Sequence, residues 1–429
     1  MVLPASQMFE SLNIPYFGPV DGHDVDSLIK LFKAMSGLNH PAVLHIYTQK
    51  GKGFKPADTQ PSKYHSTGPF KINGDEVEQT TGTATTSFTN VFGKYLTELA
   101  EKDQKIVAIT SAMCDGTGLV EFRDKFKDRF YDVGIAESAA VDIAAGLAKT
   151  GLKPVVCIYS TFLQRAFDQI FQEVALQNLP VVFCIDRAGF VGLDGPTHHG
   201  LMDIGFLRMM PNMVLTAPAN EIEMKLALEF ALGANKPVVI RYPKDLVPPQ
   251  EDVKTACASP FKLGKSIIVK KTKDSPIVII SYGSVLTEAL KAAYLLDKDG
   301  IAADVINARF AAPVDEAILA LLGTGKSIIT VEDHHLACGF GSAVLESAAG
   351  ASNPSTVRLR SPQTSLRTGN RLADIRVLGV PRKFIGHNYR SLQLKEAGIN
   401  AEKIAETAKE IQHSLHNTYS SSNIEYSGL

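Results

Sequence analysis

The sequence predicts an α/β protein in which a doubly wound parallel sheet is followed by a smaller α/β domain. Its 429 residues suit two to three domains, and 45% hydrophobic with 21% charged residues is the usual mix of a globular protein. Several runs are short, rich in β-branched residues and free of polar alternation, which is typical of strands buried on both faces of a parallel sheet. Helical patterns separate these runs and indicate right-handed βαβ crossovers.

Residues 1–80 contain too few elements for a domain. The helical pattern is DVDSLIKLFKAMSG and the strand-like run is PAVLHIYT, whereas the stretch from Gly51 to Asp75 reads as a loop because of its Lys, Gly, Pro and Ser content. One helix and one strand cannot close a core. We therefore expect this region to be the end of a domain whose beginning is absent from the sequence.

Residues 85–245 are predicted to form the doubly wound sheet. The first helix has one apolar face, made of Val91, Phe92, Tyr95, Leu96 and Leu99. The expected strands lie in KIVAIT, PVVCIY, PVVFCID, MVLTAP and PVVIRYP.

The remainder of the chain repeats the alternation on a smaller scale. Residues 246–262 are rich in prolines and charges and read as a linker. Residues 263–415 form the second α/β domain, with expected strands in PIVIISYG, AADVINA, SIITVED and DIRVLG. Residues 416–429 are polar and are expected to be a frayed tail.

Charge and cysteine usage exclude several classes of protein. The formal net charge of −1 offers no global attraction to nucleic acid or to an anionic membrane surface. The five cysteines are scattered without a CxxC pair, which favours reduced thiols and a cytoplasmic location over a disulfide scaffold or a zinc site. No apolar run approaches the roughly 18 residues that a membrane span requires.

The most informative stretch is YDVGIAESAAVDIAAGLAKTG, which places Glu137 in the first turn of an Ala-rich helix that Gly151 can cap. A glutamate there has a simple structural explanation, because it complements the helix dipole. Its context adds weight to a functional role. Downstream, in fixed order, follow YSTFLQRAFDQ (159–169), DRAG (186–189) and GLDGPTHHG (192–200), and upstream lie GPVDGHD (18–24), KGKGF and KYH. This ordered set resembles the 1-deoxy-D-xylulose-5-phosphate synthases, within the wider group of transketolases and other thiamine-diphosphate enzymes.

The resemblance implies a pyrimidine-binding domain in residues 85–245 and a transketolase C-terminal-like domain in residues 263–415. It assigns to Glu137 the hydrogen bond to the cofactor's aminopyrimidine ring, through which the thiazolium C2 proton is removed. Phe162 would stack on the pyrimidine, although it also shares an apolar helix face with Ala166 and Ile170. Tyr159 and Arg165 would face the reacting carbon. A tyrosine at the end of a strand is equally compatible with a hydroxyl in water.

The resemblance also implies residues that hold the acceptor sugar. Asp194 and His198 would contact its carbonyl and hydroxyl, and a histidine there can move protons near neutral pH. His199 would be a solvent-exposed neighbour of His198, and His65 would reach in from the first region. The acceptor phosphate would be held by a cationic group of Arg187, Arg241 and Lys244. For Arg241, a structural pairing with Asp or Glu is the slightly favoured alternative.

The chain departs from the family pattern in three respects. The family's Gly-Asp-Gly motif and later asparagine, which bind Mg²⁺ and through it the diphosphate, have no counterpart here, so the ligands of Mg²⁺ are expected in the missing domain. Ser138 and Ala139 replace the glutamine and histidine that usually follow the glutamate, and Lys244 replaces an arginine. His334-His335 lacks further ligands at metal-binding spacing, and GFGSA (339–343) is a weak glycine loop.

The activity implied by the resemblance is that of a thiamine-diphosphate-dependent transferase. It would join pyruvate, with decarboxylation, to glyceraldehyde 3-phosphate, and the product would enter isoprenoid, thiamine and pyridoxal synthesis. The chain would act as a homodimer or with a separate diphosphate-binding polypeptide. Two alternatives remain: the C-terminal subunit of a split transketolase, and a non-catalytic remnant that serves as an interaction or regulatory protein.

Overall fold

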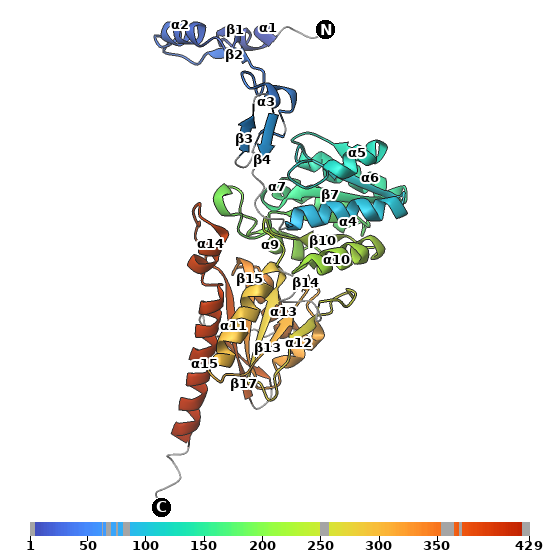
Figure 1. The fold of residues 1–429 in the computed structure, drawn as a ribbon, viewed down its shortest axis with the longest axis vertical. Coiled ribbons are helices and arrows are strands. Elements are labelled where there is room, and N and C mark those ends of the chain that lie inside the picture. Colours follow the sequence, from blue (N-terminus) through green and yellow to red (C-terminus); the bar gives the residue numbers. More distant parts are fainter. Residues whose placement is uncertain are drawn as a thin grey trace, which may run out of the picture. The chain divides into compact units, whose positions relative to one another are not determined.

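The computed structural model describes residues 5–61, 63–65, 70–73, 76–79, 86–248, 257–352, 364–368 and 371–422. The chain divides into two compact units, Met1–Ala84 and Thr85–Leu429 (Figure 1).

The first unit has more regular structure than its sequence suggested. Strands β1 and β2 pair in parallel, and β3 and β4 form an antiparallel hairpin. A helix also interrupts the stretch expected to be a loop. Strand β1 was not predicted because the glycine and proline in YFGPVD are typical of turns. Helix α3 was not predicted because the Lys, Gly, Pro and Ser content around it is typical of loops. The elements are α1 (Ala5–Glu10), β1 (Tyr16–Asp21), α2 (Val25–Met35), β2 (Val43–Tyr47), α3 (Lys55–Thr59), β3 (Phe70–Asn73) and β4 (Glu76–Gln79).

The second unit begins with a seven-stranded sheet in the order β14-β9-β10-β8-β7-β5-β6. All neighbouring pairs are parallel except β14 with β9. Each of the five strands predicted between residues 85 and 245 is present, because a run buried on both faces leaves little choice of structure. The strands are β5 (Ile106–Thr110), β6 (Phe130–Asp132), β7 (Lys153–Tyr159), β8 (Val182–Asp186), β9 (Val214–Thr216), β10 (Val238–Arg241) and β14 (Phe310–Ala312).

Helices cover both faces of this sheet, so the doubly wound α/β fold is confirmed. Helices α4 and α10 pack on one face, and helix α6 with residues 160–175 packs on the other. The helices are α4 (Phe88–Lys102), α5 (Val120–Lys125), η1 (Lys127–Arg129), α6 (Glu137–Lys149), α7 (Ser160–Leu163), η2 (Gln164–Ala166), α8 (Phe167–Gln169), η3 (Ile170–Ala175), η4 (Gly192–Asp194), α9 (Asp203–Arg208) and α10 (Glu221–Gly233).

The smaller domain contains a six-stranded sheet in the order β11-β13-β12-β15-β17-β16. Its central pairs are parallel, and its two edge strands are antiparallel. The strands are β11 (Ile267–Lys270), β12 (Ile277–Tyr282), β13 (Ala303–Asn307), β15 (Ser327–His335), β16 (Thr364–Thr368) and β17 (Arg371–Val380). The helical elements are η6 (Gly283–Val285), α11 (Leu286–Lys298), α12 (Glu316–Leu321), α13 (Phe340–Ser352), α14 (Arg390–Ala397) and α15 (Ala401–Ser422).

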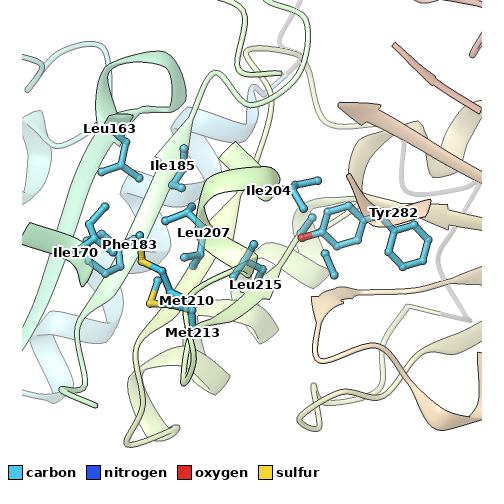
Figure 2. Packing of buried hydrophobic residues seen from close by; sticks show 14 of the residues in the cluster. Leu163, Ile170, Phe183, Ile185, Ile204, Leu207, Met210, Met213, Leu215 and Tyr282 are labelled. Carbon is cyan, nitrogen blue, oxygen red and sulfur yellow. The ribbon is translucent and has the colours of Figure 1, made fainter. Parts of the chain in front are cut away.

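The two domains of the second unit share a core. Strand β14 belongs to the chain of the smaller domain but pairs with β9 at the edge of the first sheet. One buried apolar cluster runs from Phe183 and Leu215 in the first sheet to Tyr282 in the second (Figure 2). The guanidinium of Arg309 also pairs with Glu223 of α10 at 2.7 Å, and both side chains are almost fully buried. The two domains are therefore continuous in their packing.

Two local expectations need correction. The helix expected from Thr161 is a broken one: a short α-helical turn is followed by 3-10 and π-helical turns up to Ala175, although Ala166 and Ile170 are buried on one face as expected. Residues 416–422, which were expected to belong to a frayed tail, lie in α15, and residues 423–429 lie outside the described residues. Once a helix has formed, each residue added to its end gains one backbone hydrogen bond without a new nucleation cost. Polar residues can therefore prolong an existing helix.

All five cysteines are free thiols, and four of them are buried. No helix among the described residues has the length and apolar content that a membrane crossing requires.

Candidate functional site

The predicted site residues gather at the carboxyl ends of the parallel strands. Glu137 follows β6, Tyr159 ends β7, Arg187 follows β8 and Lys244 follows β10. In an open α/β sheet this edge is where loops form a ligand-binding crevice, because the strand order reverses there. The reversal lies at β5, which is flanked by β6 on one side and β7 on the other.

Glu137 is the first residue of helix α6 and is only 4% exposed. Arg165 lies beside it, with its guanidinium nitrogen 3.4 and 3.5 Å from the two carboxylate oxygens. These are long contacts for a charged pair, so the carboxylate can still accept a shorter hydrogen bond. Ser138 donates its hydroxyl to the backbone oxygen of Arg165 at 3.0 Å and so ties α6 to the broken helix. Ser138, which departs from the family pattern, therefore helps to position Arg165, the partner of Glu137.

Phe162 lies at the centre of an aromatic group, and Arg165 contacts both this ring and the Glu137 carboxylate. Its ring stacks on Tyr159 with 5.9 Å between centroids and meets the ring of His198 edge-on at 5.4 Å. The guanidinium of Arg165 is 6.0 Å from its centroid. Phe162 is half-buried and also packs against the core. Both interpretations of Phe162, a core aromatic and an exposed stacking face, are compatible with this geometry.

Arg187 lies over the ring of Tyr159, with 4.0 Å from the guanidinium carbon to the ring centroid. It pairs with the fully buried Asp186 at 3.1 Å and donates to the backbone oxygen of Gly116. Burial raises the pKa of Asp186 even with Arg187 beside it. Burial likewise raises the pKa of the Tyr159 hydroxyl, which therefore stays protonated and can donate a hydrogen bond. Arg187 is 12% exposed, so only part of it faces the crevice.

Lys244 and Asp194 are brought together by the fold. The ammonium nitrogen of Lys244 lies 2.6 Å from a carboxylate oxygen of Asp194, and both side chains are about a third or more exposed. In the same loop, His198 is half-buried and its Nδ1 is 2.9 Å from the hydroxyl of Thr197. The residues expected to hold the acceptor are therefore grouped, but in this state Lys244 is neutralised by a carboxylate.

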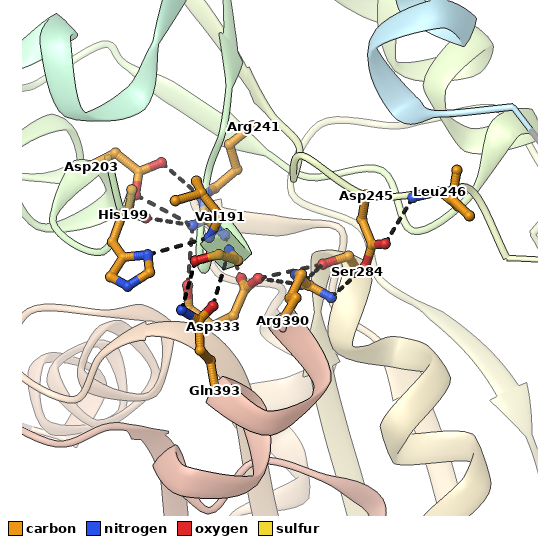
Figure 3. Close-up of polar contacts among 12 residues, drawn as sticks. Val191, His199, Asp203, Arg241, Asp245, Leu246, Ser284, Asp333, Arg390 and Gln393 are labelled. Carbon is orange, nitrogen blue, oxygen red and sulfur yellow. Dashed lines mark hydrogen bonds and ion pairs between the residues drawn. The ribbon is translucent and has the colours of Figure 1, made fainter. Parts of the chain in front are cut away.

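Arg241 does not belong to that cationic group. Its side chain is 3% exposed and forms a two-point contact with Asp203, at 2.8 and 3.3 Å, and a contact of 3.2 Å with Asp333 (Figure 3). A guanidinium enclosed by two buried carboxylates is not available to a phosphate. The geometry therefore favours the structural pairing that was the alternative for Arg241.

His199 occupies a different environment from the solvent-exposed one that was expected. Its side chain is 5% exposed, its Nδ1 accepts from the backbone of Val191 and its Nε2 donates to the backbone oxygen of Ile385. Its side chain therefore points into the interior, unlike that of His198. His65 is exposed within the first unit, so its role stays a prediction. His334 is buried as well, and no cluster of His, Cys, Asp or Glu among the described residues could hold a metal ion.

Sequence reasoning missed three residues that shape the site. A side chain on Gly116 would place its Cβ 1.6 Å from the hydroxyl of Tyr159, so any other residue there would displace the Tyr159 ring. The carboxylate of Asp132 accepts hydrogen bonds from the backbone amides of Ala112 and Gly134, at 2.8 and 3.0 Å. These bonds hold the backbone segment that leads to Glu137. Gln393 contacts the 192–200 loop from the smaller domain. The pair of glycines in DGTG after a strand was the available signal for Gly116.

The family comparisons match consecutive parts of the chain. Residues 84–250 match the family described as transketolase, pyrimidine binding domain, and residues 264–373 match transketolase, C-terminal domain. Residues 1–48 match the family described as 1-deoxy-D-xylulose-5-phosphate synthase.

Curated relatives agree with this assignment. The chain is 47% identical to a 1-deoxy-D-xylulose-5-phosphate synthase of Halothermothrix orenii over 79% of this chain and 52% of the relative. It is 44% identical to the synthase of Aquifex aeolicus over 94% of this chain and 60% of the relative. The chain thus spans between half and two thirds of the length of these relatives.

Solved structures show the same architecture. A structure described as a split gene transketolase, inactive beta4 tetramer, is 26% identical with a TM-score of 0.62, covering 76% of this chain and 98% of that one. A transketolase of Campylobacter jejuni is 16% identical with a TM-score of 0.62, covering 96% and 69%, and supports the fold alone. The chain therefore contains the transketolase pyrimidine-binding and C-terminal domains, and over most of its length it is similar to the 1-deoxy-D-xylulose-5-phosphate synthases.

Proposed function

We propose that this chain carries the pyrimidine-binding and acceptor-binding part of a transferase that joins pyruvate, with loss of CO₂, to glyceraldehyde 3-phosphate. The observation that carries the proposal is the buried Glu137 carboxylate at the start of α6, next to Arg165 and the ring of Phe162. The 1-deoxy-D-xylulose-5-phosphate synthases that resemble the chain over most of its length support the choice of substrates.

The residues present fit the pyrimidine end of thiamine diphosphate. An aminopyrimidine requires a carboxylate that can accept an N–H and an aromatic ring with a partly open face. Glu137 and Phe162 supply these groups, each of them near Arg165. When bound, this cofactor supplies the carbon atom that takes up the two-carbon fragment of pyruvate.

Each residue of the chain then has a defined task. Glu137 holds the ring in orientation and exchanges a proton with it, and Arg165 keeps this carboxylate in place. His198 donates or accepts the proton at the acceptor's carbonyl and hydroxyl oxygens. Lys244 binds the acceptor phosphate once that phosphate displaces Asp194, and the exposed part of Arg187 adds a second positive charge.

The diphosphate and its Mg²⁺ require groups beyond those described here. Two phosphates cannot be buried without neutralisation, and we propose that a first-domain polypeptide supplies the metal ligands. The similar solved structure of a split gene transketolase supports this division into two halves, and its chain is covered almost completely by this one.

That likeness also supports a second candidate, the C-terminal subunit of a split transketolase that moves a two-carbon unit between sugars. The two candidates differ in donor. The synthase consumes pyruvate and releases CO₂, whereas a transketolase takes its fragment from a ketose phosphate. A non-catalytic remnant would use neither donor.

Complementation tests these candidates. The chain is mixed with the first domain of the Aquifex aeolicus relative, thiamine diphosphate, Mg²⁺, pyruvate and glyceraldehyde 3-phosphate, and 1-deoxy-D-xylulose 5-phosphate is measured by mass spectrometry. The proposal expects product with the mixture and none with the chain alone. Conversion of a ketose phosphate without CO₂ release would favour the transketolase, and no turnover with either donor would favour the remnant.

We further propose that the chain forms a homodimer. A groove of about 780 Å³ is lined by apolar side chains that include Phe167, Met202, Met209 and Phe384, all of them exposed in the single chain. The split gene transketolase is described as a beta4 tetramer, an assembly of one chain type, which favours a second copy as the occupant. Light scattering should give twice the chain mass, and Met209→Glu should give the monomer. A monomer for the unmodified chain would contradict the proposal.

A further inference from the structure

The loop of residues 189–200, which carries Asp194 and His198, is closed at its base by backbone hydrogen bonds. The amide of Gly189 donates to the carbonyl of Gly200 at 2.7 Å, and the amide of Gly200 donates back at 2.9 Å. Between these points the described secondary structure is a short 3-10 turn, η4. The middle of the 189–200 loop is therefore held by contacts with other parts of the chain. These contacts position the side chains of Asp194 and His198.

Gln393 on helix α14 supplies one such contact. The amide of Gly192 donates to its Oε1 at 3.0 Å, and its Nε2 donates to the carbonyls of Gly192 at 3.0 Å and Gly386 at 2.8 Å (Figure 3). Gln393 is fully buried. A peptide amide can only donate and a carbonyl can only accept, so this arrangement uses every polar atom of the glutamine side chain in one orientation.

The neighbouring residues reinforce this contact. The ring of His199 bridges the amide of Val191, at 3.3 Å, and the carbonyl of Ile385, at 3.1 Å. Burial lowers the pKa of His199, which keeps the ring neutral and able to accept at Nδ1. The ring of His387 occupies the space where a Cβ on Gly195 would lie, within 2.3 Å of that position.

Helix α14 also contacts the segment after β10 that contains Lys244. Arg390, one turn before Gln393, donates to the carboxylate of Asp245 at 2.8 Å and to that of Asp333 at 2.8 Å (Figure 3). Asp245 follows Lys244 directly in the sequence. A single short helix of the smaller domain therefore contacts both segments that meet in the pair of Lys244 and Asp194.

We infer that helix α14 is a positioning element for the acceptor side of the site. Gln393 sets the place of Asp194 and His198 through Gly192, and Arg390 sets the place of Lys244 through Asp245. The inference rests on the proposed function, which gives these three residues the acceptor. Gln393 touches no reacting group, so it is a positioning residue. If the loop is in its competent conformation only part of the time, acceptor affinity falls by that fraction.

The first test measures the loop itself and needs no activity. Hydrogen exchange is followed in the peptide covering residues 190–200 for the full chain, for Gln393→Met and for the matched control Ser391→Met, which changes an exposed residue of the same helix. Because several buried hydrogen bonds are lost, exchange in Gln393→Met should be at least about tenfold faster. The control and a peptide covering β7 should keep the rates of the unmodified chain. Unchanged exchange in Gln393→Met would overturn the inference.

The second test separates positioning from mere packing. In the complemented enzyme, Gln393→Met should raise KM for glyceraldehyde 3-phosphate about tenfold and leave KM for pyruvate within about twofold. Faster exchange with an unchanged acceptor KM, or with equal losses for both substrates, would overturn the acceptor role. If far-UV circular dichroism shows that Gln393→Met does not fold, Gln393→Asn replaces it, since it keeps the amide but falls short of Gly192. An inactive unmodified complex would overturn the proposed function and the acceptor role with it, while the exchange rates still report whether Gln393 holds the loop.

Discussion

Replacing Arg241 with methionine tests whether this arginine is a partner in a structural ion pair or a ligand of the acceptor phosphate. The substitution keeps an unbranched side chain but leaves Asp203 and Asp333 without the guanidinium that lies 2.8 and 3.2 Å from them. Asp333 retains Arg390 at 2.8 Å, whereas Asp203 is 1% exposed and loses its two-point partner. Removing one partner of a buried pair costs about 3–5 kcal/mol, and Asp203 should account for most of it.

Urea unfolding followed by circular dichroism at 222 nm measures this loss, since the chain has no tryptophan. The midpoint should fall markedly for Arg241→Met and should recover in large part when Asp203→Asn is added, because the stranded charge is then removed. A variant with unchanged stability but weakened binding of glyceraldehyde 3-phosphate would refute the structural interpretation and return Arg241 to the cationic group.

Three further outcomes are expected. Burial lowers the pKa of His334 to about 4, so the unfolded chain binds a proton near pH 6.5 that the folded chain does not bind. The contribution of His334 to stability is therefore complete above that pH and falls by about 3 kcal/mol as the pH drops toward 4. Thermal melts across this range should show a smaller loss of stability with falling pH in His334→Gln than in the unmodified chain. Lys244→Ala, at an exposed position, should raise KM for glyceraldehyde 3-phosphate about tenfold in the complemented enzyme and Lys244→Arg should lower it, whereas equal effects on pyruvate would contradict a phosphate contact. Gly116→Ala should displace the ring of Tyr159 from Arg187, seen as a lower melting temperature and a higher acceptor KM; a fully stable, active variant would contradict the close approach.

The central strands of both sheets could be predicted because their sequences leave few alternatives, whereas the edge strands β6, β11, β14 and β16 were not predicted. Buried runs such as PVVFCID have no polar face and are too short for a buried helix, so β8 and its neighbours follow from composition alone. Strand β14 has no such signature. Its three residues pair with β9 across the domain boundary, and only the tertiary fold brings the two together.

The site shows the same division. Glu137 could be placed at the start of a helix because the Ala-rich run and Gly151 define both ends of α6. The burial of His199 could not be foreseen, because its partner Ile385 lies far away in the sequence. A structural pairing of Arg241 was the slightly favoured alternative, but the sequence did not reveal Asp333 as a partner. Gln393 is 201 residues from the glycine that it contacts, so no local pattern reveals it.

The most direct test of the account concerns the carboxylate of Glu137. Exchange of the C2 proton of bound thiamine diphosphate is measured by NMR in the complemented enzyme, for the unmodified chain, for Glu137→Gln and for the matched control Glu316→Gln, an exposed glutamate in the first turn of α12. Glutamine keeps the size of the side chain but cannot exchange a proton. The account predicts exchange about 10²–10⁴-fold slower in Glu137→Gln and unchanged in the control. Unchanged exchange in Glu137→Gln would make Glu137 only a helix N-terminal carboxylate and would contradict the proposed function.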